Sequence, residues 1–194
     1  MNILMVADTH GRLMQRDIAK VLDGRTPDVV FLLGDMSVDD VEALQDFEGT
    51  KNVPMYGVIG NHDSHDLLSS HGITDLHLKT MKIGEYVVGG FGGSIRYKDD
   101  PSYLMYTNPQ SDEILSDFAG CDIFLTHDKP CFKPFPLFKN MAVHAHSGLT
   151  GIAKYIERCQ PAYAFHGHMH DRYTETHKGT KIRCCYDLEW IELP

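Results

Sequence analysis

The sequence predicts an α/β fold that begins with a parallel sheet. The first observation is the order of elements, because three apolar runs at residues 2–8, 28–33 and 53–59 alternate with two amphipathic segments. The second is that each apolar run ends on aspartate, asparagine or histidine side chains. Strand–helix–strand units are right-handed and parallel, and open α/β sheets collect ligands at the carboxyl ends of their strands. Both observations favour a parallel sheet with one site at its edge.

The connections between these strands carry the signals of helices. The first helix is expected over about residues 13–22, with apolar residues on one face and Gly24 at its C-terminal cap. Ser37 is expected to cap the second helix, because acids follow it in the first turn, where the helix dipole favours them. A short third helix is expected near residues 64–70.

The middle of the chain changes to short strands and loops. Three apolar pieces at 76–78, 81–83 and 86–88 are typical of short strands. The glycine-rich stretch 89–93 predicts tight bends or close approach of the backbone. Residues 94–108 have no regular period, so we interpret them as a long loop that borders the site.

The second half of the chain again mixes helices and strands. Pro109 is expected to open a helix that runs to about Phe118, with Asn108 as its cap. Another helix is expected over 149–159, and the long loop before it, 129–147, is of a length that usually serves function. The remaining strands are predicted at residues 121–126, 162–165, 173–177, 181–185 and 187–193.

The composition is that of an ordinary globular protein. A length of 194 residues suits one domain with a sizeable core, and 42% hydrophobic content is usual for such a protein. No apolar stretch could span a bilayer, and the first strand begins too early for a signal peptide, so we expect no membrane partner and a cytoplasmic location. The net charge of −9 makes a nucleic-acid partner unlikely, because nucleic-acid binding rests on Lys and Arg.

Five polar motifs close predicted strands, and their order is informative. Each has an ordinary reading alone, as a helix cap, a surface loop or a core histidine, but five in succession indicate one shared site. Gly60 is expected to supply the positive φ of a tight turn. The motifs are Asp8-Thr9-His10, Gly34-Asp35, Gly60-Asn61-His62-Asp63, Thr126-His127 and Gly167-His168-Met169-His170.

In this order the motifs resemble those of the calcineurin-like metallophosphoesterase superfamily. The resemblance extends from Asp8 to His170 and so covers most of the chain. It implies a four-layer α/β/β/α sandwich, in which two mixed β-sheets are flanked by helices, formed by a single domain over residues 1–194.

The resemblance also implies a dinuclear metal site. The ligands are Asp, Asn and His without cysteine. This set is typical of sites for Mn²⁺, Fe or Zn²⁺ and not of structural zinc sites, which use cysteine thiolates. We expect two divalent ions, with Mn²⁺ as the first choice. Asp35 is expected to bridge the two ions. The first ion is assigned to Asp8, His10, Asp35 and His170, and the second to Asp35, Asn61, His127 and His168.

His62 is the catalytic residue that the resemblance implies. It is expected to face the substrate, stabilise the phosphoryl oxygens and protonate the leaving group, a task suited to a histidine near neutral pH. Many relatives orient this histidine with an aspartate three residues after the bridging one, but Val38 stands there in this chain. The orienting group is therefore left open between Asp39 and Asp63.

The implied reaction is hydrolysis of a phosphoester by water that the two metals activate, without a covalent phospho-enzyme. A small-molecule phosphodiesterase, with cyclic nucleotides among its substrates, is favoured by aromatic and cationic residues in the two long loops. The alternatives are a small-molecule phosphomonoesterase, a protein phosphatase, or a non-catalytic scaffold on the same fold, like a retromer subunit. The loop residues are Tyr97, Tyr103, Tyr106, Phe132, Phe135, Phe138, Arg96, Lys98, Lys129 and Lys133, with His144 and His146 at the expected pocket rim.

Overall fold

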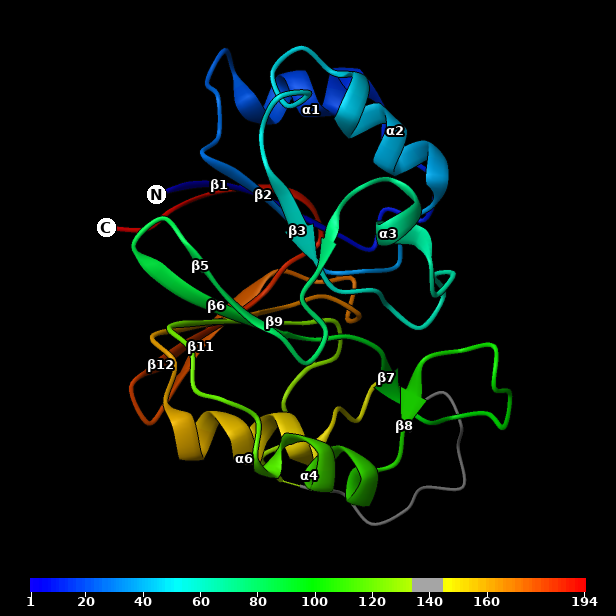
Figure 1. Ribbon diagram of the computed structural model, residues 1–194, viewed down its shortest axis with the longest axis vertical. Helices are drawn as coiled ribbons and strands as arrows, with labels where there is room; N and C mark the ends of the chain where they lie inside the picture. The colour runs from blue at the N-terminus through cyan, green and yellow to red at the C-terminus, as the bar shows by residue number, and fades with distance from the viewer. Residues whose placement is uncertain (134–144) are drawn as a thin grey trace.

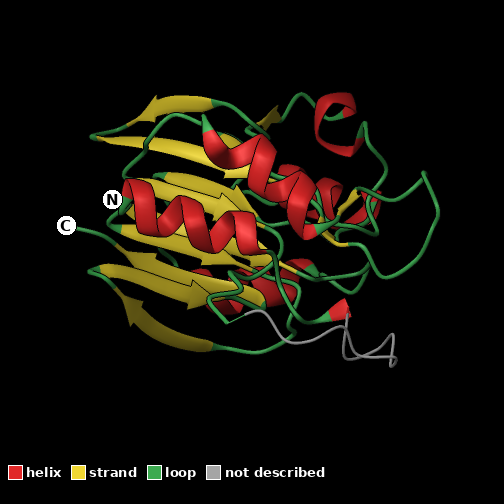
Figure 2. Cartoon of the chain, turned by 90° about the horizontal axis from the view of Figure 1, so that it is seen from below, coloured by secondary structure: helices red, strands yellow, loops and turns green. Residues whose placement is uncertain are grey.

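Two mixed β-sheets pack face to face between two layers of helices in the computed structural model, which describes residues 1–133 and 145–194 (Figure 1). This arrangement confirms the predicted four-layer sandwich. Helices α1 (Gln15–Leu22), α2 (Val38–Asp46) and α3 (Leu67–Ser70) cover the first sheet. Helices α4 (Asn108–Ser116) and α6 (Thr150–Cys159) cover the second, and Figure 2, viewed from their side, shows helices lying across the strands.

The first sheet contains the predicted parallel strands and is closed by one antiparallel strand. Its strands β1 to β4 are mutually parallel, and the C-terminal strand β13 pairs with β1 in the opposite direction. The order is β13 (Asp187–Glu192), β1 (Asn2–Ala7), β2 (Val29–Leu32), β3 (Met55–Gly57) and β4 (Thr74–Asp75).

The second sheet is also mixed, with a parallel centre and antiparallel edges. Strands β12, β10, β9 and β6 are parallel, whereas β11 and β5 pair in the opposite direction. The order is β11 (Tyr173–His177), β12 (Thr180–Cys184), β10 (Tyr163–His166), β9 (Ile123–Thr126), β6 (Tyr86–Phe91) and β5 (Thr80–Ile83), and a separate pair is formed by β7 (Ser94–Ile95) and β8 (Met105–Tyr106).

Alternation along the strands divides the core into three layers. In β1, Ile3 and Met5 pack between the two sheets, whereas Leu4 and Val6 face α1 and α2. Because successive side chains of a strand point to opposite faces, both faces of β1 are buried. This explains why the first strand is apolar without interruption.

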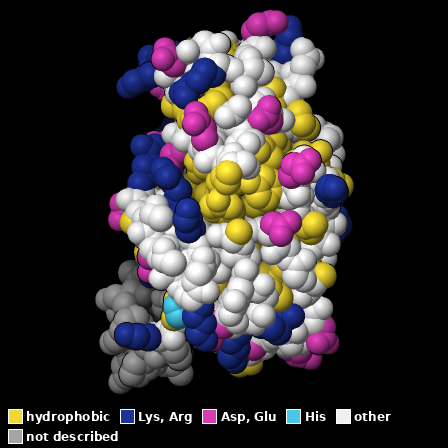
Figure 3. All heavy atoms as spheres, turned by 90° about the vertical axis from the view of Figure 1, so that its left-hand side faces the viewer, with side chains coloured by type: hydrophobic (Ala, Val, Ile, Leu, Met, Phe, Trp, Pro, Cys, Tyr) yellow, Lys and Arg dark blue, Asp and Glu magenta, His cyan; other side chains and the backbone are white. Residues whose placement is uncertain are grey.

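Both termini lie at the edge where the parallel strands begin, and the strands run away from it (Figure 2). Figure 3 shows this edge face-on, with hydrophobic side chains gathered in its middle. A hollow there is lined by Met1, Pro54, Tyr56, Tyr86 and Pro194, among others. The carboxyl ends of the parallel strands are therefore on the far side of the molecule from the termini.

Several local expectations need correction. Helix α4 is capped by Thr107 and not by Asn108, because the Thr107 side chain accepts a hydrogen bond from the Gln110 N–H. The C-terminal cap of α1 is Asp23, at φ 49°, one residue before Gly24. Residues 94–108 are not wholly a loop, since they contain β7 and β8.

The glycine-rich stretch does not begin with a bend, because Gly89 and Gly90 lie within strand β6. These glycines instead allow close approach of neighbouring residues to the backbone. A Cβ on Gly90 would come within 2.7 Å of Val58 in the facing sheet. None of the helices in the described part of the chain has the length and apolar character needed to cross a lipid bilayer.

Candidate metal centre

The predicted ligands meet at the carboxyl ends of strands from both sheets, and their backbone is unusual. Non-glycine residues at positive φ are uncommon, and they are concentrated at functional sites, where the surrounding structure imposes the conformation. Here such residues turn the chain sharply just after β1, β2 and β10, which directs neighbouring side chains into one place. They are Asp8 (φ 56°), His10 (φ 48°), Asp35 (φ 55°), His168 (φ 65°) and His170 (φ 51°).

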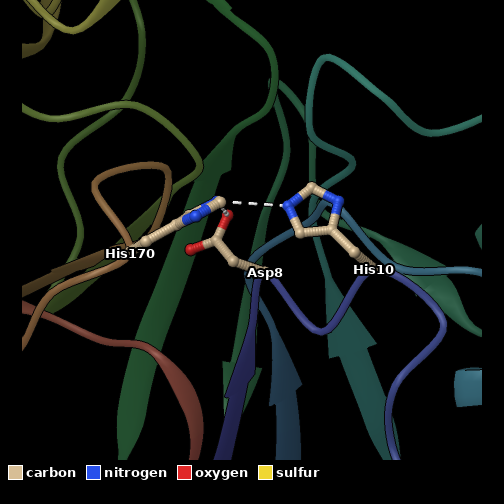
Figure 4. A group of neighbouring side chains, drawn as sticks. All are labelled: Asp8, His10 and His170. Atoms are coloured by element: carbon tan, nitrogen blue, oxygen red, sulfur yellow. Dashed lines mark hydrogen bonds and ion pairs between the residues drawn. The ribbon is translucent and has the colours of Figure 1, made fainter.

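The first group consists of Asp8, His10 and His170, whose donor atoms all lie within 4.8 Å of one another (Figure 4). The Nε2 atoms of His10 and His170 are 3.1 Å apart, and His170 Nε2 is 3.9 Å from Asp8 Oδ1. Asp8 is fully buried, and its Oδ2 accepts a hydrogen bond of 2.8 Å from the His168 N–H. Its Oδ1 has no hydrogen-bond partner in the described part of the chain. A buried carboxylate oxygen without a donor, beside two imidazoles, fits a cation.

The second group consists of Asp35, His127 and His168, with Asn61 beside them, and all are buried. His127 Nδ1 lies 2.8 Å from the Leu33 carbonyl, and His168 Nε2 lies 2.8 Å from the Ala145 carbonyl. Since carbonyls only accept, each of these nitrogens carries the proton of its ring. The other nitrogens, His127 Nε2 and His168 Nδ1, then present lone pairs to each other at 3.2 Å.

Two oxygens point at the same place. Asn61 Oδ1 is 3.0 Å and Asp35 Oδ1 is 3.5 Å from His127 Nε2. Burial lowers the pKa of His127, which favours the neutral ring. Lone pairs of two imidazoles, a carboxylate and an amide thus converge without a proton between them. This donor set fits a divalent cation of the first transition series.

Asp35 lies between the two groups. Its Oδ2 is 3.8 Å from His10 Nε2 in the first group, while its Oδ1 faces His127 in the second. Burial acts to raise the pKa of Asp35, but the charge that His127 carries when it is protonated and the hydrogen bond from the His62 N–H outweigh this effect and keep the pKa below its ordinary value. For Asp8, burial and the nearby Asp35 carboxylate raise the pKa to about 8. A cation would remove the charge repulsion behind this shift.

His62 belongs to neither group and is exposed at the edge of the centre. Its ring centroid is 5.8 Å from that of His10 and 5.8 Å from that of Tyr103, with the Tyr103 ring almost perpendicular at 88°. Among the described residues, no carboxylate hydrogen-bonds the His62 ring, so neither open candidate fills the orienting role. Asp39 is exposed on α2, and both carboxylate oxygens of Asp63 bind backbone N–H groups elsewhere.

Asp63 fixes the turns that carry the ligands. Its carboxylate accepts hydrogen bonds from the N–H groups of Gly60 (2.7 Å), Asp35 (2.9 Å) and Met36 (2.7 Å). The backbone of Gly60 does not adopt the expected positive φ. Glycine is required there by space instead, since a Cβ would lie 2.1 Å from Asp35 Oδ1.

Asp40 is the supporting residue whose role the sequence reasoning missed. It is fully buried, although it was expected only as an acid in the first turn of α2. Its carboxylate accepts hydrogen bonds from Thr9 Oγ1 (2.7 Å) and from the N–H groups of Gly11 (2.6 Å), Leu13 (2.9 Å) and Ser37 (2.9 Å). Asp40 therefore fixes the loop after β1, which carries Asp8 and His10, through Thr9, Gly11 and Leu13. The Ser37-x-x-Asp40 capping box was the signal that could have identified it.

The aromatic residues of the long loops divide into two kinds. Tyr97 and Tyr103 lie beside the centre, where the Tyr97 hydroxyl is 3.2 Å from Asn61 Nδ2. Tyr106 packs on Phe91 with 4.9 Å between ring centroids, and Phe132 stacks on His177 at 3.8 Å, so both stabilise the loops instead. The His146 ring is 5.1 Å from that of His168. Phe135, Phe138 and His144 lie outside the described residues.

Comparison with known proteins identifies the family of the chain and finds solved structures with a similar fold. The model of the calcineurin-like phosphoesterase superfamily domain matches residues 1–184. A search of curated proteins gives no match. Solved structures with a similar fold include TT1561 of Thermus thermophilus, with a TM-score of 0.66 and 18% identity over 96% of this chain and 89% of that one.

Two further solved structures are similar. The phosphopantetheinyl hydrolase of Mycobacterium tuberculosis has a TM-score of 0.63 and 12% identity, covering 98% of this chain and 95% of its own. An archaeal phosphodiesterase has a TM-score of 0.55 and 15% identity, covering 96% of this chain and 84% of its own. At such low identities these likenesses show the fold alone.

Proposed function

The chain belongs to the calcineurin-like phosphoesterase superfamily, and from this premise we propose that it is a metal-dependent hydrolase of small-molecule phosphoesters that prefers diesters. The observation that carries the proposal is the convergence of lone pairs from His127, His168, Asp35 and Asn61 without a proton to share. The buried, unpartnered Oδ1 of Asp8 supports a second cation beside it. We infer that Asp8, His10, Asp35 and His170 bind one divalent ion, and that Asp35, Asn61, His127 and His168 bind the other, with Mn²⁺ as the first candidate.

The residues of the chain divide the chemical work. When bound, the two ions supply Lewis-acid activation of a water nucleophile and neutralise charge on the phosphoryl oxygens. Asp35 orients both groups because its two oxygens face different histidines. His62 is exposed and outside both groups, next to His10, so it is free to donate a proton to the leaving oxygen of the ester.

The preference for diesters rests on the residues beside His62. Tyr103 meets the His62 ring edge-on, and Lys98 Nζ lies 2.9 Å from the centroid of the Tyr103 ring. A diester has a second substituent on phosphorus that must be accommodated, and an aromatic face beside a cation suits a planar group such as a base. Tyr97 and Tyr103 form such a surface next to the metal groups.

Metal analysis combined with two chromogenic substrates tests the proposal. The protein purified with Mn²⁺ is expected to contain about two ions per chain. It should hydrolyse bis-p-nitrophenyl phosphate faster than p-nitrophenyl phosphate at equal concentration. Turnover of the monoester alone would favour the phosphomonoesterase alternative. Bound metal without turnover of either substrate would favour the scaffold, and absence of bound metal would contradict the proposed site.

A further inference from the structure

Tyr97 is fixed relative to the second metal group through the residue that follows His127. The Asp128 carboxylate is buried and accepts a hydrogen bond of 2.8 Å from the N–H of Ile95 in β7. The N–H of Arg96 then donates to the Tyr106 carbonyl at 2.8 Å. The two residues that precede Tyr97 therefore both have their backbone N–H groups hydrogen-bonded, and these bonds fix the position of the backbone that leads into Tyr97. Its side chain is half-buried, and its hydroxyl lies 3.2 Å from Asn61 Nδ2.

The Tyr97 hydroxyl contacts Asn61, the amide ligand of the proposed centre. Asn61 is completely buried, with Oδ1 3.0 Å from His127 Nε2 and Nδ2 3.2 Å from the Tyr97 hydroxyl. An amide can bind a cation only through its oxygen, so the NH₂ group must then find an acceptor on the opposite side. In the part of the chain that the structure describes, the Tyr97 hydroxyl is the hydrogen-bond partner of that NH₂ group.

We propose that Tyr97 is a positioning residue, which holds the Asn61 amide with its oxygen toward the second metal group. This inference rests on the metal centre of the proposed function. Second-sphere partners that orient a ligand typically change metal affinity by about 10–100-fold when removed. Tyr97 itself touches no other proposed ligand in the described contacts, so its effect passes through Asn61.

The coupling works in both directions. If Tyr97 favours the orientation of Asn61 that binds the cation, the bound cation must favour the matching position of Tyr97 by the same factor. Tyr97 belongs to the segment 96–104, which also carries Tyr103 beside His62 and Lys98 next to the Tyr103 ring. Metal binding should therefore also favour this position of Tyr97, which lies in the surface that we assign to the substrate.

The test uses the metal-free protein and Mn²⁺ alone, titrated by calorimetry. Tyr97→Phe removes only the hydroxyl and should weaken binding of one of the two ions by about 10–100-fold. Tyr106→Phe is the matched control, because it removes a hydroxyl bonded to His77 at the base of the same segment and should leave both affinities unchanged. In an Asn61→Ala background, Tyr97→Phe should have no further effect on affinity. Hydrogen exchange should show Mn²⁺ protecting residues 96–104 in the wild type but not in Tyr97→Phe.

The outcomes separate this inference from the proposed function. A wild-type protein that binds no Mn²⁺ overturns both. A wild type that binds two ions, together with a Tyr97→Phe variant of equal affinity, overturns the role of Tyr97 alone. If Tyr97→Phe lowered the affinity for Mn²⁺ equally in the wild type and in the Asn61→Ala background, the role of Tyr97 would also be overturned, because Tyr97 would then not act through Asn61.

Discussion

At the scale of single residues, Asp35 is the side chain that both proposed metal groups share. One of its oxygens faces His10 and the other faces His127, in different groups. Asp35→Asn keeps the size but replaces one oxygen with an NH₂ group, which repels a cation. We expect the variant to lose both ions, measured by elemental analysis of the purified protein.

His170→Ala is the comparison for Asp35→Asn, because His170 contributes to the first group only. That variant should keep about one ion per chain, since the second group is intact. An Asp35→Asn protein that retains two ions and full turnover would show that Asp35 is not shared.

His62 leads to a different result, because it is exposed and lies outside both groups. His62→Ala should lower kcat by about 10²–10⁴-fold, the usual contribution of a general acid, while metal content stays at the wild-type level. The loss should be smaller for p-nitrophenyl esters than for alkyl esters, since p-nitrophenolate leaves without a proton. His65→Ala, another exposed histidine of the same loop, is the control and should have wild-type kcat. Loss of metal in His62→Ala would contradict this assignment.

At the scale of elements, the start of α2 and the loop after β1 form one unit through Asp40. Four donors from Thr9, Gly11, Leu13 and Ser37 bind this buried carboxylate. Burial acts to raise the pKa of Asp40, but these hydrogen bonds outweigh it and keep the pKa low, so the group is charged. Asp40→Ala leaves several buried donors without a partner and should reduce the free energy of unfolding by about 3 kcal/mol.

The neighbouring Asp39→Ala is the matched control for Asp40→Ala. Asp39 is exposed in the same turn, and its removal should change stability by less than about 0.5 kcal/mol. Urea denaturation of both metal-free variants measures the difference. Equal stability of the two variants would mean that the Asp40 contacts contribute little.

The elements also show what could and could not be predicted from the sequence. Continuous apolar runs located β1, β2 and β9, and the polar residues after them located the candidate ligands, because both signals are local. The caps of α1 and α4 were wrong by one residue, which is within the ordinary uncertainty of helix ends. The Ser37-x-x-Asp40 pattern marks Asp40 as part of a capping box, but it does not encode the contacts of Asp40 with the loop after β1. The contacts of Asp63 and Gly60 with Asp35 likewise join loops far apart in the chain.

At the scale of the whole molecule, two buried carboxyls with raised pKa values, those of Asp8 and Asp63, make the metal-free protein sensitive to alkali. Burial and the Asp35 carboxylate raise the pKa of Asp8 to about 8, and the same two causes raise that of Asp63 to about 7, from an ordinary 3.8. Above pH 3.8 the folded protein thus holds protons that the unfolded chain has lost, so stability falls as the pH rises toward 8. Buried histidines such as His127 and His166 have lowered pKa values and act in the opposite direction, and their effect on the slope is half of its maximum at their ordinary 6.5 and fades about one pH unit above it.

Between about pH 7.5 and 8.5, where an ordinary histidine has already lost about nine-tenths of its protons, the carboxyls therefore decide the sign. The free energy of unfolding of the metal-free protein should fall over this interval, by at most about 1.4 kcal/mol per pH unit for each carboxyl. Asp8→Asn should flatten the dependence, and the exposed Asp39→Asn should not. Mn²⁺ should raise the melting temperature more at pH 8 than at pH 6.5, because cations bind the deprotonated carboxylates. A stability that is constant or rises over this interval would contradict the raised pKa values.

Each metal group takes side chains from both sheets, and this has a consequence for how the protein is made. Asp8, His10, Asp35 and Asn61 follow strands of the first sheet, whereas His127, His168 and His170 follow strands of the second. A ribosome delivers the first four early, but His168 and His170 emerge only after most of the chain has been synthesised. Neither proposed ion can be fully coordinated until the second sheet has docked on the first. Under the proposed assignment, an ion with its full set of ligands would therefore mark a chain whose two sheets have already docked.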